Sequence, residues 1–301
     1  MIILLEGDIT EDTNAEAIVT AANAGLFGGG GVDGAIHRAA GPTVLEECCL
    51  LGGCAPGDAK ITSAGRLHAK HIIHAVGPVW KGGSSGEAEL LACCYTRSIE
   101  LAAEHDCKVV ACPAISTGAY GYPAPEAARV TVAATLAALD AHPTVEEALF
   151  YLFDENTRRI FEQALHREKA WRAIEASPSA GQVLREDVDS ISAMETRVAV
   201  PYGRHLTMAE AQRLHECVIP EGSDDRWFAF VAEGMLHLHR TWTGFHIFEA
   251  RLVESADGGA ELVDVWANDD ADQRGVEANA MARHLDKTIK VLLDGAETNG
   301  P

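Results

Sequence analysis

The sequence has few basic residues for its length. Its 301 residues include 24 Lys and Arg against 45 Asp and Glu, which gives a formal net charge of −21. Nucleic acids and anionic membranes are bound through clusters of positive charge, so this balance argues against either as a partner. A small anionic ligand is still compatible with it, because backbone N–H groups can hold an anion without a basic side chain.

Long apolar runs and paired cysteines are also missing. No apolar stretch is long enough to cross a bilayer, and no signal peptide precedes the first predicted strand. The 8 cysteines include no Cys-x-x-Cys pair, and most lie in apolar segments, where a free thiol behaves as a small hydrophobe. We therefore expect a protein of the reducing cytoplasm.

Short apolar runs alternate with longer amphipathic stretches up to about residue 165. The pattern predicts strands over residues 2–5, 18–21, 59–63, 71–75, 109–112 and 148–153. It predicts helices over 32–40, 43–51, 87–105, 123–141 and 155–165. Strands that alternate with helices form a largely parallel sheet covered on both faces, so this part is expected to be α/β.

The remaining sequence has a different pattern. Residues 168–180 are helix-like at first and then become rich in Ser, Pro and Ala, and 169–180 are predicted to be a linker. Strands are predicted over 227–232, 235–240, 245–254 and 261–266, with a hairpin turn at Glu233-Gly234, and a helix over 272–293. We therefore expect a first domain over 1–168 and a smaller α+β domain with an antiparallel meander over 181–301.

The most informative segment is a run of four glycines that leads into the helix predicted from Val32. The run consists of Gly28, Gly29, Gly30 and Gly31. Successive backbone N–H groups at a helix start form an anion site, which the helix dipole strengthens. Asn23 before the run and Asp33 after it place an amide and a carboxylate beside the anion. The alternative is a flexible linker, but apolar segments flank the run closely on both sides.

A second loop of small residues follows the strand predicted over 109–112. Its central residues are Ser116, Thr117, Gly118, Ala119 and Tyr120. Small residues let the backbone curl around an anion, and Pro123 is suited to the start of the next helix. An ordinary strand-to-helix turn is the alternative for this segment alone. Two such loops at one edge of a parallel sheet indicate a diphosphate.

Two more residues follow predicted strands at the same edge. Asp8 comes after the first strand and could accept a hydrogen bond from the exocyclic amine of a base. Phe153 ends the last strand of the α/β part and could stack on that base. The alternatives are a helix or turn cap for Asp8 and a core aromatic for Phe153.

Five stretches of the first 165 residues occur in the order found in one known family. They are Gly-Asp-Ile-Thr at 7–10, Ala-Ala-Asn at 21–23, the glycine run and its helix at 28–42, His-Ala-Val-Gly-Pro at 74–78, and Pro-Ala-Ile-Ser-Thr-Gly-Ala-Tyr-Gly-Tyr-Pro at 113–123. Together they resemble macrodomains of the MacroD-type branch, which are ADP-ribose-binding hydrolases. The resemblance implies three layers around a mixed, mostly parallel sheet, with ADP-ribose in the cleft.

The resemblance also implies which part of the ligand each residue contacts. Asp8 and Ile9 would hold the adenine with Phe153 near the ring, and the two loops, with Val32 and Ala22, would surround the diphosphate. Asn23 and Asp33 would contact the distal ribose. His37, one helical turn after Asp33, would either orient that acid or simply pack.

The implied reaction is hydrolysis at the distal ribose. It would release mono-ADP-ribose from acidic side chains of proteins or deacetylate O-acetyl-ADP-ribose, so these are the expected partners. The loops would position a water, and Asp33 or the phosphate would accept its proton. No cofactor is required, and no cluster of His and Cys in the first domain has the spacing of metal ligands.

One residue departs from the family pattern. The family usually has Asn-Ala-Ala-Asn at the end of the second strand, whereas this sequence has Thr20 at the first of these positions. A hydroxyl replaces an amide, so a hydrogen bond that organises the loop is expected to be shortened or lost. Binding should survive. A reader that binds ADP-ribose without hydrolysing it is therefore the alternative function.

No family is recognised in residues 181–301, and their notable feature is histidine. His237 and His239 would share one face of a strand, which makes a metal pair conceivable, and His246 follows nearby. No third ligand has convincing spacing, and Cys217 is distant. The favoured interpretation is polar sheet faces, with Trp227 and Trp242 in or near the core, in a domain that selects the modified substrate or a partner.

Overall fold

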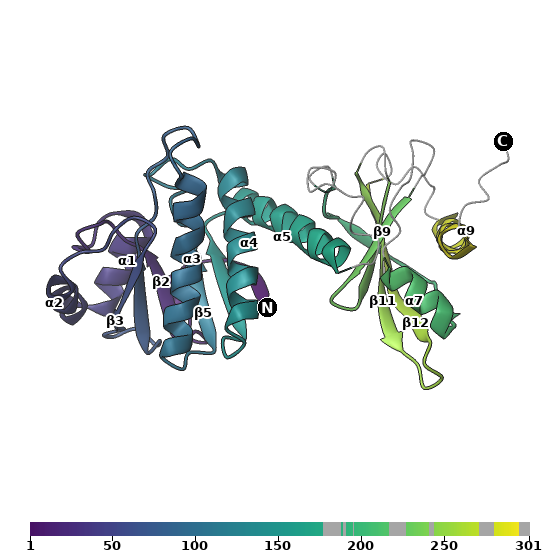
Figure 1. Ribbon diagram of the computed structural model, residues 1–301, viewed down its shortest axis with the longest axis horizontal. Coiled ribbons are helices and arrows are strands. Elements are labelled where there is room, and N and C mark those ends of the chain that lie inside the picture. The colour runs from purple at the N-terminus through teal and green to yellow at the C-terminus, as the bar shows by residue number, and fades with distance from the viewer. Residues whose placement is uncertain are drawn as a thin grey trace. The chain divides into compact units, whose positions relative to one another are not determined.

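The computed structural model describes residues 1–176, 188, 191–194, 196–216, 227–240, 244–270 and 280–294. The chain forms two compact units, Met1–Leu165 and His166–Pro301 (Figure 1). That residues 1–168 and 181–301 fold independently as two domains stays a prediction. In the described part of the chain, no helix combines the length and apolarity needed to cross a membrane.

The first unit is built on a six-stranded mixed sheet in the order β1-β6-β5-β2-β4-β3. The strands are β1 (Ile2–Glu6), β2 (Ala17–Ala21), β3 (Ala59–Ser63), β4 (His71–Ala75), β5 (Val109–Pro113) and β6 (Glu147–Leu152). All neighbours run parallel except β3, which is antiparallel to β4. All six strands were predicted, with bounds that differ by at most one residue.

Helices cover both faces of this sheet. They are α1 (Gly31–Ala40), α2 (Pro42–Leu51), α3 (Glu87–Glu104), α4 (Ala124–Ala141) and α5 (Glu155–Glu175), with a short 3-10 helix, η1 (Ile9–Glu11). Ile36 of α1 packs in the same core as Ile18 of β2. Tyr95 of α3 packs in the other core with Val19, the next residue of β2. Because neighbouring strand residues face opposite ways, this confirms the three-layer α/β prediction.

The second unit contains an antiparallel sheet in the order β7-β12-β11-β10-β9, with β8 also paired to β12. The strands are β7 (Arg197–Val200), β8 (Arg204–Leu206), β9 (Trp227–Ala232), β10 (Met235–Arg240), β11 (His246–Glu254) and β12 (Ala260–Asn268). The meander of β9 to β12 confirms the α+β prediction. Glu233 and Gly234 both have positive φ, which confirms the tight hairpin.

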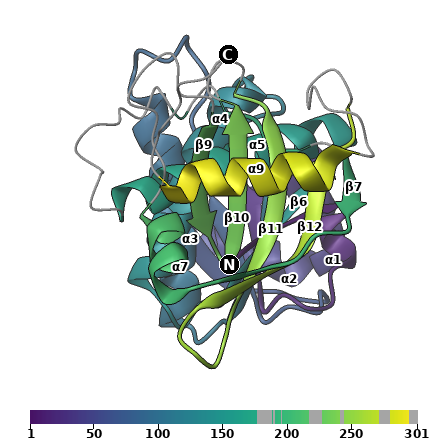
Figure 2. The same ribbon diagram turned by 90° about the vertical axis from the view of Figure 1, so that its right-hand side faces the viewer.

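The two faces of this sheet are covered by different helices. On one face, α9 (Met281–Asp294) crosses the strands (Figure 2), and its Leu285 and Ile289 share a core with Trp227 and with α7 (Met208–His215). The burial of Trp227 confirms its predicted place in the core. Phe228 and Phe230 instead belong to a core with residues of α5.

The structure corrects two sequence boundaries. Residues 169–175 of the predicted linker continue α5, because Ala170 and Ile174 are buried against Phe228 and Phe230. Residues 177–180 lie outside the described part. The last helix was predicted from residue 272, and the described helix begins at Met281, while residues 271–279 lie outside the description. The strands β7 and β8 and helix α7 were not predicted.

Most cysteines are buried, as predicted. Burial raises the pKa of the Cys48 thiol to about 11 and that of the Cys94 and Cys112 thiols to about 12. These three thiols therefore stay protonated at neutral pH and act as small packing groups. Cys217 lies outside the described residues.

Candidate functional site

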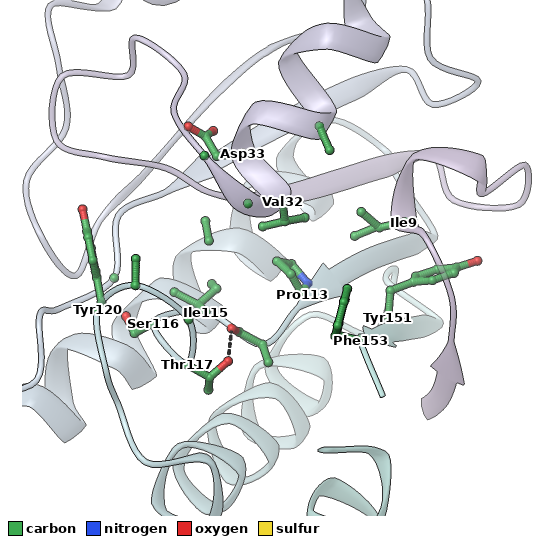
Figure 3. Close-up of a pocket in the computed structure, with 18 of the residues that line it drawn as sticks. Ile9, Val32, Asp33, Pro113, Ile115, Ser116, Thr117, Tyr120, Tyr151 and Phe153 are labelled. Atoms are coloured by element: carbon green, nitrogen blue, oxygen red, sulfur yellow. Dashed lines mark hydrogen bonds between the residues drawn. The ribbon is translucent and has the colours of Figure 1, made fainter. Parts of the chain in front are cut away.

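A cavity of about 770 Å³ opens at the carboxyl ends of β1, β2, β5 and β6 (Figure 3). Its volume is within the range of small-molecule sites, about 300 to 1,000 Å³. The strands β2 and β5 are neighbours, but the chain continues from β2 to α1 on one face of the sheet and from β5 to α4 on the other face. Because the two connections separate, a crevice forms between the ends of these strands.

Most residues predicted for the site line this cavity. They are Asp8, Ile9, Ala22, Asn23, Gly29, Gly30, Gly31, Val32, Asp33, Ser116, Thr117, Gly118, Ala119, Tyr120 and Phe153. Gly28 and His37 do not line it. Asp8 and Asp33 are the charged lining residues, and no Lys, Arg or His lines the cavity within the described part of the chain. Any anion bound here must therefore be held largely by backbone N–H groups.

The glycine run is the loop before α1 and its first residue, so the linker alternative is wrong. Gly30 caps the helix in an extended conformation, and a Cβ atom at Gly30 would meet nothing within 4 Å. A Cβ atom at Gly34 would lie 2.1 Å from the carbonyl oxygen of Gly29. Gly34 thus permits the close approach that folds the run onto its helix.

Asn23 holds the same loop from the end of β2. Its Nδ2 donates to the carbonyl oxygen of Gly28 at 2.8 Å, and its Oδ1 accepts from the N–H of Gly25 at 3.1 Å. Gly28 therefore contributes to the site through this carbonyl and not as a lining residue. Asn23 both shapes the loop and faces the cavity.

Asp33 is a buried carboxylate in the first turn of α1. It is only 4% exposed, and its Oδ1 accepts a hydrogen bond from the hydroxyl of Thr20 at 3.0 Å. Its Oδ2 lies toward the glycine run, 3.6 Å from where a Cβ atom of Gly29 would be. One oxygen is thus anchored while the other is directed at the loop.

Opposing effects act on the protonation of Asp33. Burial raises the pKa of this carboxyl above its ordinary value of 3.8, while the Thr20 hydrogen bond and the nearby His37 act to lower it. The net direction is upward, which makes the carboxylate a better proton acceptor than an exposed aspartate.

Thr20 keeps a hydrogen bond at the position where the family usually has asparagine. Its side chain is fully buried at the end of β2, and its hydroxyl reaches Asp33 across the gap between strand and helix. The departure from the family pattern therefore leaves Asp33 with a polar partner.

His37 lies behind Asp33 and not at the cavity. Its Nε2 is 3.6 Å from Asp33 Oδ1, and its ring centroid is 5.7 Å from that of His74. Any influence of His37 on a ligand acts through Asp33, so it is a positioning residue. This position is compatible with the predicted role of orienting Asp33, and the place of His37 among the catalytic residues stays a prediction.

The loop after β5 is held in a tight turn. Ser116 has a φ of +67°, and its carbonyl oxygen accepts from the N–H of Tyr122 at 3.0 Å. Its hydroxyl oxygen is buried and has no hydrogen-bond partner among the described residues. A buried unpaired hydroxyl costs about 1–3 kcal/mol, and a ligand oxygen in the cavity would offset that cost. Gly77 allows this turn, because a Cβ atom there would lie 2.2 Å from Ser116 Oγ.

The opposite end of the cavity is aromatic and apolar. Ile9, Tyr151 and Phe153 lie together there, away from Asp33 and Tyr120 (Figure 3). Phe153 is 94% exposed, so the core-aromatic alternative is wrong. Asp8 caps η1 by accepting from Thr10 N–H at 2.9 Å, which confirms the cap alternative, and it lines the cavity as well.

Sequence analysis missed Tyr151 as a lining residue. It lies two residues before Phe153, so strand alternation would have placed both side chains on the same side. Its hydroxyl donates to Asp12, which fixes the ring beside the cavity. Thr157, on the first turn of α5, was also missed and carried no signal in the sequence.

Comparison with known proteins identifies this unit. Residues 19–131 match the family described as Macro domain. A macro domain-containing protein of Chlorobaculum tepidum is 51% identical over 165 residues, which are 55% of this chain and 95% of that protein. The chain belongs to the macro domain family. An O-acetyl-ADP-ribose deacetylase of Citrobacter koseri is also 51% identical, over 54% of this chain and 93% of its own length.

Solved macrodomains share the fold. The Oceanobacillus iheyensis macrodomain with ADP matches at a TM-score of 0.50 and 38% identity, over 55% of this chain and 90% of that one. The Trypanosoma brucei macrodomain in complex with ADP-ribose matches at 0.50 and 36%, over 53% and 67%. These comparisons confirm the predicted macrodomain fold.

The burial of one histidine predicts that the macrodomain loses stability in acid. His74 is fully buried beside Thr62, whose hydroxyl lies 2.9 Å from His74 Nε2, and burial lowers the pKa of His74 to about 4. The unfolded chain, with an ordinary value of 6.5, binds this proton first, so stability present at pH 7 is lost as the pH falls from 6.5 toward 4.

Between pH 7 and pH 5, we expect the free energy of unfolding of the wild type to fall by about 2 kcal/mol more than that of His74→Gln. Urea unfolding of the full-length wild-type and variant chains at both pH values measures this loss. His68→Gln, at an exposed position, is the matched control and should leave the loss unchanged. An equal loss in His74→Gln and wild type would contradict the assignment.

Proposed function

We propose that this macrodomain binds ADP-ribose and hydrolyses the ester at its distal ribose. The substrates are proteins with mono-ADP-ribose on acidic side chains, or O-acetyl-ADP-ribose. The observation that carries the proposal is the buried Asp33 carboxylate, which Thr20 holds at the cavity beside the glycine run. The names of two relatives as O-acetyl-ADP-ribose deacetylases support the same chemistry.

The cavity suits a ligand with a charged middle and two different ends. The loops at Gly30 and at Ser116 offer backbone N–H groups to a diphosphate from two sides, together with the unpaired Ser116 hydroxyl. Phe153 and Tyr151 at one end suit a stacked base. Asp33 and Asn23 toward the other end suit the distal ribose.

Asp33 supplies the proton transfer in this proposal. Water adds to the ester carbonyl carbon and gives one proton to Asp33 or to the bound diphosphate. That proton returns to the ribose oxygen as the carbon–oxygen bond breaks, so the products are a carboxylic acid and the free ribose hydroxyl. The N–H groups of the loops stabilise the negative charge that forms on the carbonyl oxygen.

A reader without hydrolytic activity is the alternative. In that case Asp33 would only accept hydrogen bonds from the ribose. The retained Thr20 hydrogen bond favours hydrolysis, because it holds Asp33 in the orientation that a base requires.

Binding is tested at Gly30. We expect Gly30→Glu to weaken ADP-ribose binding at least about tenfold, which corresponds to about 1.4 kcal/mol. Gly30 has an extended backbone and open space at its Cβ position, so the glutamate folds into the cavity and repels the diphosphate. Isothermal titration calorimetry measures the affinity, and an unchanged melting temperature confirms the fold.

Gly30→Gln is the matched control, since it has the size of glutamate without its charge. It should weaken binding less than Gly30→Glu does. If ADP-ribose binds Gly30→Glu as tightly as wild type, the diphosphate does not lie at this loop.

Turnover is tested at Asp33. We expect Asp33→Asn to lower the single-turnover rate of release from a glutamate-linked ADP-ribosyl protein by about 10²-fold or more, the range of a lost general base. Binding of ADP-ribose should change little, because the loops and their N–H groups are intact. Tight binding with no release by the wild-type protein would establish the reader.

The hydrogen bond from Thr20 predicts a pH effect. It lowers the pKa of Asp33, so Thr20→Val should raise that pKa and move the acid limb of the rate profile to higher pH. Thr20→Ser retains a hydroxyl and should keep the wild-type profile. Rates measured between pH 4 and pH 8 test this, and a superimposable Thr20→Val profile would show that Thr20 does not act on Asp33.

A further inference from the structure

Four histidines are buried together in the second unit. His166 lies on α5, His237 and His239 lie two residues apart on β10, and His246 begins β11. Each is at most 9% exposed. The expectation that His237 and His239 lie on a polar face of the sheet is therefore wrong.

Packing of α5 explains this burial. On the β9–β10 ladder, His237 is paired with Phe230 and His239 with Phe228. Phe228 and Phe230 belong to the core that contains Ala170 of α5. The helix therefore covers the sheet face that carries the histidines, and it brings His166 to them.

The ring nitrogens lie close together. His166 Nε2 is 3.0 Å from His239 Nε2, and His237 Nδ1 is 3.4 Å from His246 Nε2. One nitrogen from each of His166, His239 and His246 lies within 4.8 Å of the other two. In tetrahedral coordination at 2.0–2.1 Å, ligand nitrogens lie about 3.3 Å apart, so these rings need to close by at most about 1.5 Å.

The backbone sets the tautomer of His239. Its Nδ1 lies 3.1 Å from the carbonyl oxygen of Gly244, which can only accept, so Nδ1 carries the proton. The lone pair of a neutral His239 is then on Nε2, the atom that faces His166. A ring N–H bound to a backbone carbonyl is the usual way in which proteins orient a metal-binding histidine.

Burial in apolar surroundings disfavours a positive charge on the four imidazoles. Neutral imidazole is the form that binds metal ions. The apolar and aromatic surroundings, including the stacked Phe230, favour the same form.

We propose that His166, His239 and His246 bind one divalent transition-metal ion of the zinc type, with His237 packed beside them. Imidazole nitrogen is a good ligand for Zn²⁺, Cu²⁺ and Ni²⁺ and a poor one for Mg²⁺ and Ca²⁺. The ion joins α5 to β10 and β11, segments about 70 residues apart in sequence, and it stabilises the second unit.

A second group of possible ligands lies in the first unit, where His37, Cys48 and His74 approach one another. It is the weaker candidate. The Cys48 thiol is protonated because burial raises its pKa to about 11, and His74 Nε2 already has Thr62 as its partner. A metal bound there would have sulfur among its ligands, which a spectrum distinguishes.

The test is a titration of the full-length chain with Co²⁺ after removal of metal by a chelator. We expect one Co²⁺ per chain, the visible absorption of tetrahedral cobalt, no sulfur-to-cobalt charge-transfer band, and displacement by Zn²⁺. The melting transition that reports on the second unit should rise with Zn²⁺ concentration, because the ion binds the folded state.

His166→Gln, His239→Gln and His246→Gln are tested separately, each checked for folding by circular dichroism. Each should weaken Co²⁺ binding at least about 100-fold, since outer-shell changes alone cost 10–100-fold. His205→Gln is the control, because His205 is an exposed histidine that pairs with Asp257 and Glu261 and could bind a metal at the surface.

Absence of Co²⁺ uptake at micromolar concentration by the wild-type chain would overturn the proposal whatever the variants do. A sulfur-to-cobalt band would overturn it in favour of the Cys48 group. Loss of binding in His205→Gln with retention in folded His239→Gln would show that the ion binds only at the surface.

Discussion

The pairing of β2 with β5 is the constraint on which the site depends. The two strands are parallel neighbours, and the chain leaves them toward opposite faces of the sheet, so the loops before α1 and α4 separate at the carboxyl ends. The space between them is the cavity. Asn23 and Asp33 face it because they belong to the loop after β2 and to the helix that follows. Thr20, at the end of β2, ties that strand to the helix through Asp33.

The chain is acidic, and no basic side chain of its described part lines the cavity. Both features leave the binding of an anion to backbone N–H groups. Backbone N–H groups at loop and helix starts can hold an anion without a counter-charge, and glycine allows the backbone to approach it. In the proposed function, the shape of two loops recognises the anion, and such recognition suits a discrete diphosphate better than a polyanion.

Buried histidine occurs in both units, but in different surroundings. The polar neighbours of the His74 ring are the Thr62 hydroxyl and the Cys48 sulfur, and its neutral form is part of the packing of the first unit. The four imidazoles of the second unit face mainly one another and the ring of Phe230. One ring nitrogen from each of His166, His239 and His246 lies within 4.8 Å of the other two, and this proximity separates a candidate metal site from ordinary core histidines.

The sequence by itself determined most of the first unit and of its site. The alternation of strands and helices, the glycine run and the loop from Ser116 are local patterns, and local backbone chemistry fixes where their N–H groups point. The sequence also identified the hairpin at Glu233-Gly234, because a few adjacent residues determine a tight turn. Tyr151 could have been included by strand alternation. Helical spacing placed His37 beside Asp33, and it lies there in the structure.

Only the tertiary structure decided which polar groups meet across strands and helices. Thr20 and Asp33 are 13 residues apart, and their hydrogen bond depends on how α1 packs against the end of β2. The histidine cluster depends on α5 covering β10, with His166 brought to residues 73 positions later. Such a contact leaves no periodic pattern in the sequence. The polar side chains of a helix and a sheet meet only after the apolar residues have packed the helix against the sheet.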